Sequence, residues 1–289
     1  MFAAVIKELR IKQWVKNLFV LIPLVFDRQL LNSEALIRST IGFIIFCLVS
    51  SSVYIINDIM DIEADRQHPK KKYRPIASGK IPVNMAWIIS IFLVLLPTIT
   101  SFYLSPFFAI IIIVYFIINL AYSKKLKHLV LIDVMIIASG FVLRVAAGVS
   151  LIVVERFSPW LYVVTTLFAL FLALGKRRGE LITLENGNFI QRKVLDGYTV
   201  PFLDQLITIV SATTIVAYSL YTFSAPNLPD NHTMMLTIPF ALYGIFRYIY
   251  LVQVKNEGSA PDELVMVDRP LQITFLLFVL SVLIIFYFF

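Results

Sequence analysis

The chain has 289 residues, of which 59% are hydrophobic and 15% are charged, and its formal net charge is +7 at pH 7. A mean hydropathy of +0.85 is too high for an ordinary soluble core. The basic residues lie between apolar stretches and not along one soluble face, which argues against nucleic acid and favours anionic lipid or an anionic substrate. The lone cysteine, Cys47, excludes an intramolecular disulfide.

The apolar stretches predict an all-α, polytopic membrane protein. In lipid every backbone polar group needs an internal partner, so stretches of about 20 apolar residues must be helices. The first stretch contains Lys16 and Asn17 near its start and Pro23 within it, so a tilted or broken helix is expected there. No soluble domain remains, which predicts one transmembrane domain over residues 1–289. The nine predicted spans are 14–31, 36–57, 82–103, 106–122, 129–153, 158–175, 201–223, 233–252 and 270–289.

The distribution of Lys and Arg predicts the orientation of these spans. One set of alternate connections holds most of the basic residues, whereas the opposite set holds only Arg28, Arg38 and Arg156. Short cytoplasmic loops accumulate Lys and Arg, so the N-terminus is expected in the cytoplasm and the C-terminus outside a cell membrane. The long connections 58–81, 176–200 and 253–269 lie on the cytoplasmic side, where function is therefore expected.

The most informative segment begins at Asn57, as the second span leaves its apolar run. If the helix continues, Asp58, Asp61 and Asp65 fall within an arc of roughly 60°. Three carboxylates repel one another unless a cation neutralises them. Magnesium typically binds one or two carboxylates together with substrate phosphate oxygens, so this acidic stripe predicts a magnesium-diphosphate site. A solvated acidic helix end is the alternative.

A basic segment follows the acidic stripe directly, at residues 66–80. Pro69, Pro75 and Gly79 prevent one continuous helix, so its cations can fold back over the carboxylates. Cations above a metal would clamp a phosphate-rich ligand, and this role is expected for Arg66, Lys72 and Arg74. Lys70 and Lys71 are expected to face anionic lipid headgroups instead.

The pattern Asn57-Asp58-x-x-Asp61-x-x-x-Asp65 resembles the Asp-rich signature of the UbiA superfamily of intramembrane prenyltransferases. This resemblance implies a UbiA-like bundle of nine transmembrane helices with a polar cytoplasmic cap. Further segments are similar to the decaprenyl-phosphate phosphoribosyltransferase branch, and together they cover nearly the whole chain. They are Gln13-Trp14-Val15-Lys16-Asn17, Glu63-Ala64-Asp65-Arg66-x-His68-Pro69 through Arg74-Pro75-Ile76-Ala77-x-Gly79, Leu126-Lys127-His128 with Asp133, Gly140-Phe141-x-Leu143-Arg144-x-x-Ala147-Gly148, and Gly175-Lys176-Arg177-x-x-Glu180.

The chain departs from the superfamily pattern after the sixth span. Members that use prenyl diphosphates have a second Asp-rich motif there, whereas this chain reads Gly175-Lys176-Arg177-Arg178-Gly179-Glu180. A second carboxylate-bound metal is therefore not expected. Lys176 and Arg177 are expected to hold the additional phosphate of a phosphoribosyl diphosphate donor. An ordinary positively charged cytoplasmic loop is the alternative.

A charge inside a span is costly and needs a partner, so Arg144 in the fifth span is a candidate. Anion binding and a structural ion pair both remain open for it. Asp133, near the cytoplasmic end of the same span, is expected to serve the mouth of a cavity. The remaining candidate substrate-binding residues are Lys16, Asn17, Asn57, Tyr122, Lys127 and Glu180.

The resemblance implies Mg²⁺-dependent transfer of a 5-phosphoribosyl group from phosphoribosyl diphosphate to a polyprenyl phosphate, with Asp58, Asp61, Asp65, Lys176 and Arg177 as catalytic residues. The first alternative is a UbiA-type prenyltransferase that moves an isoprenyl chain to an aromatic or other small acceptor. The second is a transporter or lipid-binding protein, although transporters usually place ionisable groups near the bilayer midplane. Membrane lipids are expected partners, and homo-oligomerisation is left open.

Overall fold

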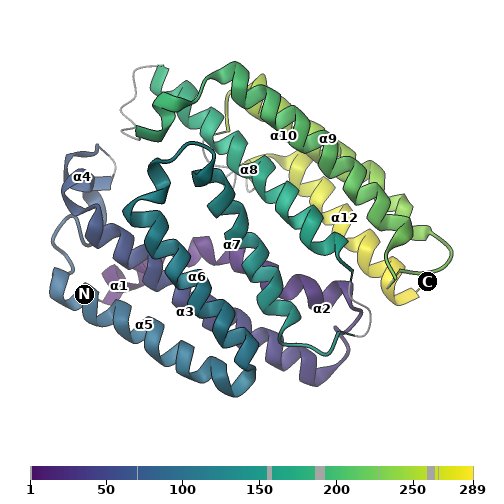
Figure 1. The fold of residues 1–289 in the computed structure, drawn as a ribbon, viewed down its shortest axis with the longest axis horizontal. Coiled ribbons are helices and arrows are strands. Elements are labelled where there is room, and N and C mark those ends of the chain that lie inside the picture. The colour runs from purple at the N-terminus through teal and green to yellow at the C-terminus, as the bar shows by residue number, and fades with distance from the viewer. Residues whose placement is uncertain are drawn as a thin grey trace. The chain divides into compact units, whose positions relative to one another are not determined.

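The computed structural model describes residues 2–69, 71–154, 158–185, 193–226, 228–258, 264–265 and 267–288, and within these residues it contains helices and no strand (Figure 1). The predicted all-helical fold is therefore confirmed. In chain order the elements are α1 (Phe2–Glu8), η1 (Ile11–Leu21), α2 (Ile22–Phe26), α3 (Ser33–Met60), α4 (Ile62–Gln67), η2 (Lys71–Tyr73), α5 (Val83–Leu104), α6 (Pro106–Lys124), η3 (Leu126–His128), α7 (Ile132–Val149), α8 (Trp160–Glu185), η4 (Lys193–Gly197), α9 (Val200–Ser224), η5 (Thr233–Thr237), α10 (Ile238–Gln253) and α12 (Arg269–Phe288).

Within the described residues, eight segments are long and apolar enough to cross a membrane: α3, α5, α6, α7, α8, α9, η5 with α10, and α12. They coincide with the second to ninth predicted spans. One boundary was wrong, because α8 continues to Glu185, well past the predicted end at residue 175. The expected cytoplasmic loop that begins at residue 176 is therefore helical at its start.

The first predicted span is not one long helix. Residues Ile11–Leu21 form a 3₁₀ helix, and α2 ends at Phe26, with Pro23 in its first turn where no backbone N–H is needed. Asn17 is buried in η1 and donates hydrogen bonds to Ser50 and Cys47 of α3. Buried polar contacts thus hold a broken segment where hydropathy alone favoured a span.

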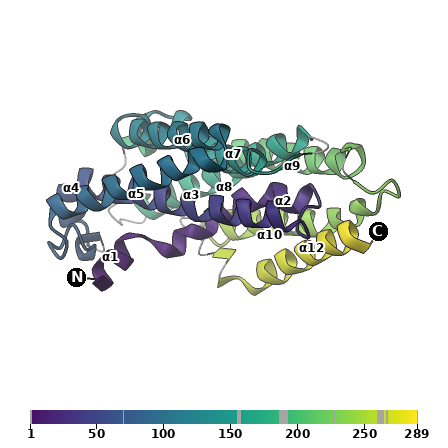
Figure 2. The same ribbon diagram turned by 90° about the horizontal axis from the view of Figure 1, so that it is seen from below.

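The chain divides into two compact units, and α7 contributes to both. Unit 1 comprises residues 1–127 and 143–154, and unit 2 comprises residues 128–142 and 155–289. In unit 1, α3 packs against α5, α6 and η1 (Figure 2), around a core that includes Phe46, Val49, Phe108 and Ile112. Asn32 caps α3 by accepting hydrogen bonds from the backbone N–H groups of residues 34 and 35.

Unit 2 has a separate core. Its long helices α8 and α9 pack along each other, and α10 packs on α12. The buried side chains include Phe171, Leu203, Ile245 and Val252. Each unit therefore has the apolar interior needed to position the polar groups at its helix ends.

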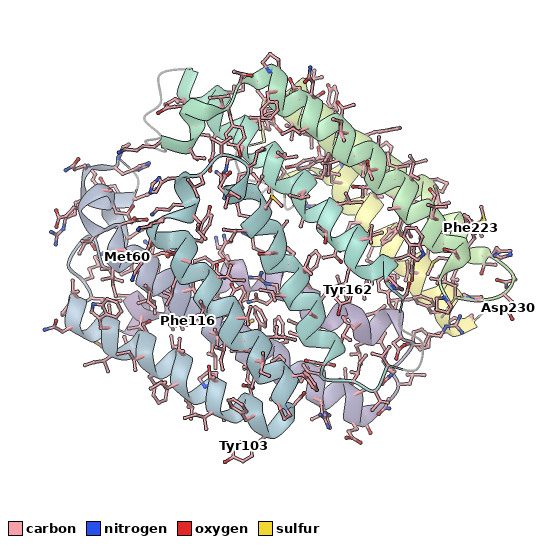
Figure 3. The ribbon with its side chains drawn as sticks, in the orientation of Figure 1. Met60, Tyr103, Phe116, Tyr162, Phe223 and Asp230 are labelled. Carbon is pink, nitrogen blue, oxygen red and sulfur yellow. The ribbon has the colours of Figure 1, made fainter. Side chains whose placement is uncertain are left out.

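Large apolar side chains also cover the outer faces of the helices. On α5 and α6 of unit 1, Ile88, Phe92 and Phe107 are 69%, 62% and 74% exposed. Tyr103 extends away from the end of α5 (Figure 3). Such continuous apolar surface is unfavourable in water and suits hydrocarbon, so these faces are the lipid-contacting surface of a multi-pass membrane protein.

Gly148 in α7 determines how closely η1 approaches within unit 1. A Cβ atom at this position would collide with the backbone oxygen of Val20 and lie 3.0 Å from ring atoms of Pro23. We expect Gly148→Ala to destabilise the protein by roughly 1–3 kcal/mol, because backbone must shift to relieve the overlap. Thermal unfolding in detergent measures this. Gly244→Ala is the matched control, since its Cβ would meet only Thr274 at 3.8 Å, and equal melting temperatures for the two variants would contradict the close approach.

Candidate functional site

The acidic stripe in unit 1 is interrupted at its middle carboxylate. Helix α3 ends at Met60, and Asp61 (φ −96°, ψ 11°) separates it from α4. The prediction of one continuous helix through Asp65 is therefore wrong. The backbone hydrogen bonds of Asp61 to Asn57 and of Asp65 to Asp61 are kept, so the two helices still follow one another closely.

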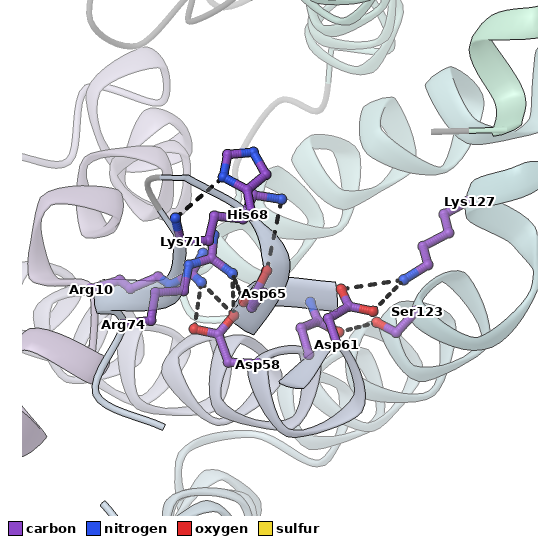
Figure 4. A network of polar contacts seen from close by, with 10 residues as sticks. Arg10, Asp58, Asp61, Asp65, His68, Lys71, Arg74, Ser123 and Lys127 are labelled. Atoms are coloured by element: carbon purple, nitrogen blue, oxygen red, sulfur yellow. Dashed lines mark hydrogen bonds and ion pairs between the residues drawn. The ribbon is translucent and has the colours of Figure 1, made fainter. Parts of the chain in front are cut away.

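Arg74 joins the first and last carboxylates of the stripe. Its Nη1 atom donates to Asp58 Oδ1 at 2.9 Å and to Asp65 Oδ2 at 2.5 Å (Figure 4). Both aspartates are buried, with only 3% and 2% of their surface exposed. The basic segment does fold back over the acidic stripe, and one cationic nitrogen lies between two buried carboxylates.

Arg10 is a second cation on this cluster, and no motif in the sequence pointed to it. Its Nη2 atom contacts both carboxylate oxygens of Asp58, at 2.5 and 2.7 Å. The guanidinium also lies 5.1 Å from the ring centroid of Tyr54. Arg10 has a left-handed backbone, with φ 51°, which is uncommon for a residue with a Cβ. Charge-assisted contacts thus hold the chain in this conformation between α1 and η1.

Glu8, at the end of α1, is a third carboxyl group of this cluster that sequence analysis missed. It is 3% exposed. Burial and the negative charge of Asp58 raise the pKa of Glu8 to about 8, against the opposing effect of Arg10 and Arg74. Glu8 Oε1 is buried and has no hydrogen-bond partner among the described residues.

Asp61 has a different partner from the other two aspartates. Lys127, which follows α6, places Nζ 3.0 Å from Asp61 Oδ1 (Figure 4). The Asp61 side chain is 42% exposed. Beside it, Asn57 accepts a hydrogen bond from Ser123. Two predicted substrate-binding residues, Asn57 and Lys127, therefore lie beside Asp61.

The other cations of the basic segment lie further from the aspartates. Arg66 pairs with Glu63 at 2.9 Å and donates to the carbonyl oxygen of Ala77 at 3.3 Å. Lys72 is exposed, with Nζ 5.2 Å from the ring centroid of Tyr73. Lys71, expected to face lipid headgroups, instead lies 3.9 Å from Asp65. Lys70, for which the same lipid contact was expected, lies outside the described residues.

The donor chemistry of this cluster fits a hard divalent cation. Carboxylate oxygens are the side-chain ligands that Mg²⁺ prefers, and the oxygens of Asp58 and Asp65 already converge on one cationic atom of Arg74. Within the described part of the chain, however, no three His, Cys, Asp or Glu side chains are arranged to hold a metal ion. Asp61 in particular forms an ion pair with Lys127. Metal binding by all three aspartates stays a prediction.

A second polar cluster of unit 1 lies among its transmembrane helices. Arg144 is 5% exposed and donates from Nε to Asn17 Oδ1 at 2.8 Å and from Nη2 to the Tyr115 hydroxyl at 3.0 Å. Its guanidinium lies 5.2 and 5.0 Å from the ring centroids of Phe46 and Tyr115. Two candidates predicted separately are thus in direct contact. The other two candidates in this part of the chain, Lys16 and Tyr122, are half-buried.

The predicted cationic site of unit 2 is a buried network. Arg177, only 1% exposed, donates from Nε to Asp133 Oδ2 at 2.6 Å and from Nη1 to Glu180. The Tyr198 hydroxyl donates to Asp133 Oδ1 at 2.7 Å and accepts from the backbone N–H of Leu131 at 2.8 Å. Burial and the contact with Asp133 raise the pKa of Tyr198. Asp133, which was expected at the mouth of a cavity, is completely buried here.

Neighbouring residues on α8 have different surroundings. Arg178 donates to Asp204 at 2.6 Å and to the carbonyl oxygen of Val252 at 2.7 Å, and thereby joins α8 to α9 and α10. Lys176 is half-buried. The i to i+3 pair of Arg177 with Glu180 supports a helical continuation of α8, which explains why the expected loop is absent at this point.

Comparison with known proteins identifies the family. Residues 28–276 match the model of the UbiA prenyltransferase family. The chain belongs to this family. Two relatives named decaprenyl-phosphate phosphoribosyltransferase match it along almost their whole length. The one from Corynebacterium glutamicum is 36% identical over 96% of this chain and 85% of its own, and the one from Mycolicibacterium smegmatis is 35% identical over 95% and 89%.

Solved structures show the same fold. The structure of a UbiA homolog from Archaeoglobus fulgidus, bound to GPP and Mg²⁺, matches with a TM-score of 0.76 and covers 98% of this chain and 99% of its own. Sequence identity is only 19%, so this likeness shows that the chain has the UbiA fold but does not identify its substrate. The predicted UbiA-like bundle is therefore confirmed.

Proposed function

We propose that this UbiA-family protein transfers a 5-phosphoribosyl group from 5-phosphoribosyl 1-diphosphate to a polyprenyl phosphate and releases diphosphate. The observation that carries this proposal is the near full-length similarity to two relatives named decaprenyl-phosphate phosphoribosyltransferase. The cluster around Asp58 in unit 1 supports it, because it places cations and carboxylates at the end of a membrane-spanning helix, where a charged donor and a lipid acceptor can meet.

The reaction requires charge neutralisation more than a strong base. The bond between the anomeric carbon and the diphosphate oxygen breaks, and a bond from that carbon to a lipid phosphate oxygen forms. The lipid phosphate is already an oxyanion at neutral pH, so no residue has to remove a proton from it. Positive charge develops at the anomeric carbon as negative charge builds on the diphosphate, and preorganised cations favour this separation.

We assign the diphosphate end of the donor to the cluster formed by Asp58, Asp65 and the arginines that contact them. A divalent cation such as Mg²⁺, held by Asp58, Asp65 and the predicted third ligand Asp61, would supply neutralisation of the departing diphosphate. Arg74 and Arg10 contact Asp58 in the structure and have the planar donor arrangement that suits phosphate. Lys127, Arg66 and Lys72 provide further donors near the acidic segment.

The acceptor phosphate is assigned to the second cluster of unit 1. Arg144 and Asn17 are buried together among apolar helices, and Lys16 is next to Asn17 in the chain. Such a site lets a phosphate be bound while an isoprenoid tail stays in hydrocarbon, and it supplies the positioning that a reaction between two anions needs. Tyr122, near the end of α6, and Asn57, beside Asp61, are assigned as further substrate-binding residues.

In unit 2, we keep Lys176 as the candidate for the additional phosphate of the donor. Arg177 is held by Asp133 and Glu180, so its proposed contribution is to fix the start of this charged helical segment. We also propose that the protein lies in the cell membrane, with its N-terminus and its active site on the cytoplasmic side and its C-terminus outside.

The proposal is tested with purified protein, radiolabelled phosphoribosyl diphosphate, polyprenyl phosphate and Mg²⁺. We expect a labelled lipid to form, with loss of product when EDTA removes the cation. A UbiA-type prenyltransferase would instead consume a prenyl diphosphate and form no phosphoribosyl lipid, which would contradict the proposed donor. Chain-length variants of the acceptor, assayed in the same way, define which polyprenyl phosphate is used.

A further inference from the structure

We propose that Tyr115 is a positioning residue of the acceptor site, where it holds the Arg144 guanidinium in the orientation that binds the phosphate of the lipid. The inference rests on the proposed function, which assigns that phosphate to Arg144 and Asn17. Tyr115 adds a residue from α6 to a site that is otherwise formed by η1 and α7. It lies outside every sequence motif that resembles the phosphoribosyltransferase branch.

Tyr115 is a tyrosine in a place where phenylalanine would pack equally well. It is 3% exposed and belongs to the buried core of unit 1 together with Phe46, Phe108 and Ile112. Its ring centroid lies 4.6 Å from that of Phe46. A hydroxyl group adds nothing to such apolar packing and needs a polar partner when it is buried. The contact with Arg144 therefore explains why this position carries a hydroxyl.

Arg144 is held at two points from two different elements. An arginine side chain has several rotatable bonds, and a guanidinium among membrane-spanning helices tends to extend towards the polar boundary. Asn17 Oδ1 accepts from Nε at 2.8 Å, and the Tyr115 hydroxyl accepts from Nη2 at 3.0 Å. The ring centroids of Tyr115 and Phe46 lie 5.0 and 5.2 Å from the central guanidinium carbon and favour the cation at this position.

The chemistry of these contacts suits anion binding. An amide oxygen, a hydroxyl group and aromatic rings orient a guanidinium without cancelling its charge, whereas Arg177 of unit 2 is held by the carboxylates of Asp133 and Glu180. Two contact points also fix the plane of the guanidinium, and bidentate binding of a phosphate depends on that plane. Removal of the Tyr115 hydroxyl should therefore weaken phosphate binding while the cation itself is retained.

The experiment measures, by isothermal titration calorimetry in detergent, the affinity of the purified full-length protein for a polyprenyl phosphate and for the matching polyprenol, without donor. The difference between these two ligands reports the phosphate contact. Tyr115→Phe keeps the ring and removes only the hydroxyl. We expect its affinity for the polyprenyl phosphate to fall about ten-fold, as for one hydrogen bond to a charged group, and its affinity for the polyprenol to stay the same. In the transfer assay the KM for the acceptor should rise, while the KM for phosphoribosyl diphosphate is unchanged.

Two further variants separate positioning from a purely structural role. Tyr218→Phe is the matched control, because Tyr218 is also buried and its hydroxyl hydrogen-bonds to that of Thr237 at 2.6 Å in unit 2. It loses a buried hydroxyl of the same kind and is expected to bind the polyprenyl phosphate like the wild type. Arg144→Gln tests whether Tyr115 acts through Arg144: adding Tyr115→Phe to it should cause no further loss of affinity.

The possible outcomes distinguish the inference from the proposed function. Equal affinities of wild type and Tyr115→Phe for the polyprenyl phosphate, or additive losses in the double variant, would overturn the role of Tyr115 alone. If the wild type binds the polyprenyl phosphate no better than the polyprenol, or Arg144→Gln binds it as well as the wild type, the assignment of the acceptor phosphate to Arg144 fails, and the role of Tyr115 fails with it.

Discussion

Asp58→Asn is expected to lower the rate of phosphoribosyl transfer at least about a hundred-fold. Asp58 lies at the centre of the unit 1 cluster, because Arg10 and Arg74 both contact it. An asparagine keeps the shape of the side chain but removes the charge that is proposed to bind a cation and that contacts two guanidinium groups. The radiolabelled-lipid assay measures the loss, and Mn²⁺ titration of the same sample shows whether cation binding is lost with it.

Two comparisons make this prediction specific. Glu34→Gln, at the opposite end of α3, should retain full activity, because Glu34 is exposed and pairs only weakly with Arg38 at 3.5 Å. Asp61→Asn should also abolish transfer if Asp61 leaves Lys127 to bind the cation. Full activity of Asp61→Asn would remove Asp61 from the metal site, and full activity of Asp58→Asn would contradict the site altogether.

Arg177→Met is expected to have the largest effect on stability. Arg177 is 1% exposed and its ion-pair partners Asp133 and Glu180 are also buried, so its removal leaves two carboxylates without their common cation. Breaking a buried ion pair from one side typically costs about 3–5 kcal/mol. For a chain of this size we expect an apparent melting temperature lower by roughly 10 °C, measured by thermal unfolding in detergent.

A rescue variant distinguishes this structural role from substrate binding. Arg177→Met combined with Asp133→Asn and Glu180→Gln removes the uncompensated charges and should regain most of the lost stability. Lys255→Met, which removes an exposed cation of the same unit, should melt like the wild type. A rescued variant that is stable but inactive would show that this network of three residues also serves the reaction, whereas recovered activity would limit the network to a structural role. A melting temperature unchanged by Arg177→Met would contradict the buried network.

Two arginines surround Asp58, and this arrangement bears on how a cation and a diphosphate would bind together. Arg10 and Arg74 occupy carboxylate oxygens that a cation would also use. Because these arginines and a divalent cation compete for the same carboxylate oxygens, we expect the cation and the diphosphate to favour each other's binding: the cation would take the carboxylates and the diphosphate would take the arginines. We expect this reciprocal effect to link donor binding to cation binding.

The sequence by itself determined the membrane architecture, because hydropathy is a local property and each span is read from its own residues. Eight of nine predicted spans correspond to helices within the described chain. The first failed as a single helix because Asn17 and Pro23 favour a broken segment, whose polar groups are satisfied by α3 and by Arg144. The acidic segment was also visible in the sequence, since its carboxylates lie within a few residues of one another.

Only the tertiary structure decided which charges meet. Asp58 contacts Arg10, which is distant in sequence, and Arg177 contacts Asp133 on another helix. No periodicity or spacing within a segment encodes such pairs, because they depend on how whole helices pack. For the same reason Glu8 had no signal in the sequence: a single glutamate near the N-terminus becomes a buried carboxyl group only once α1 packs its apolar face.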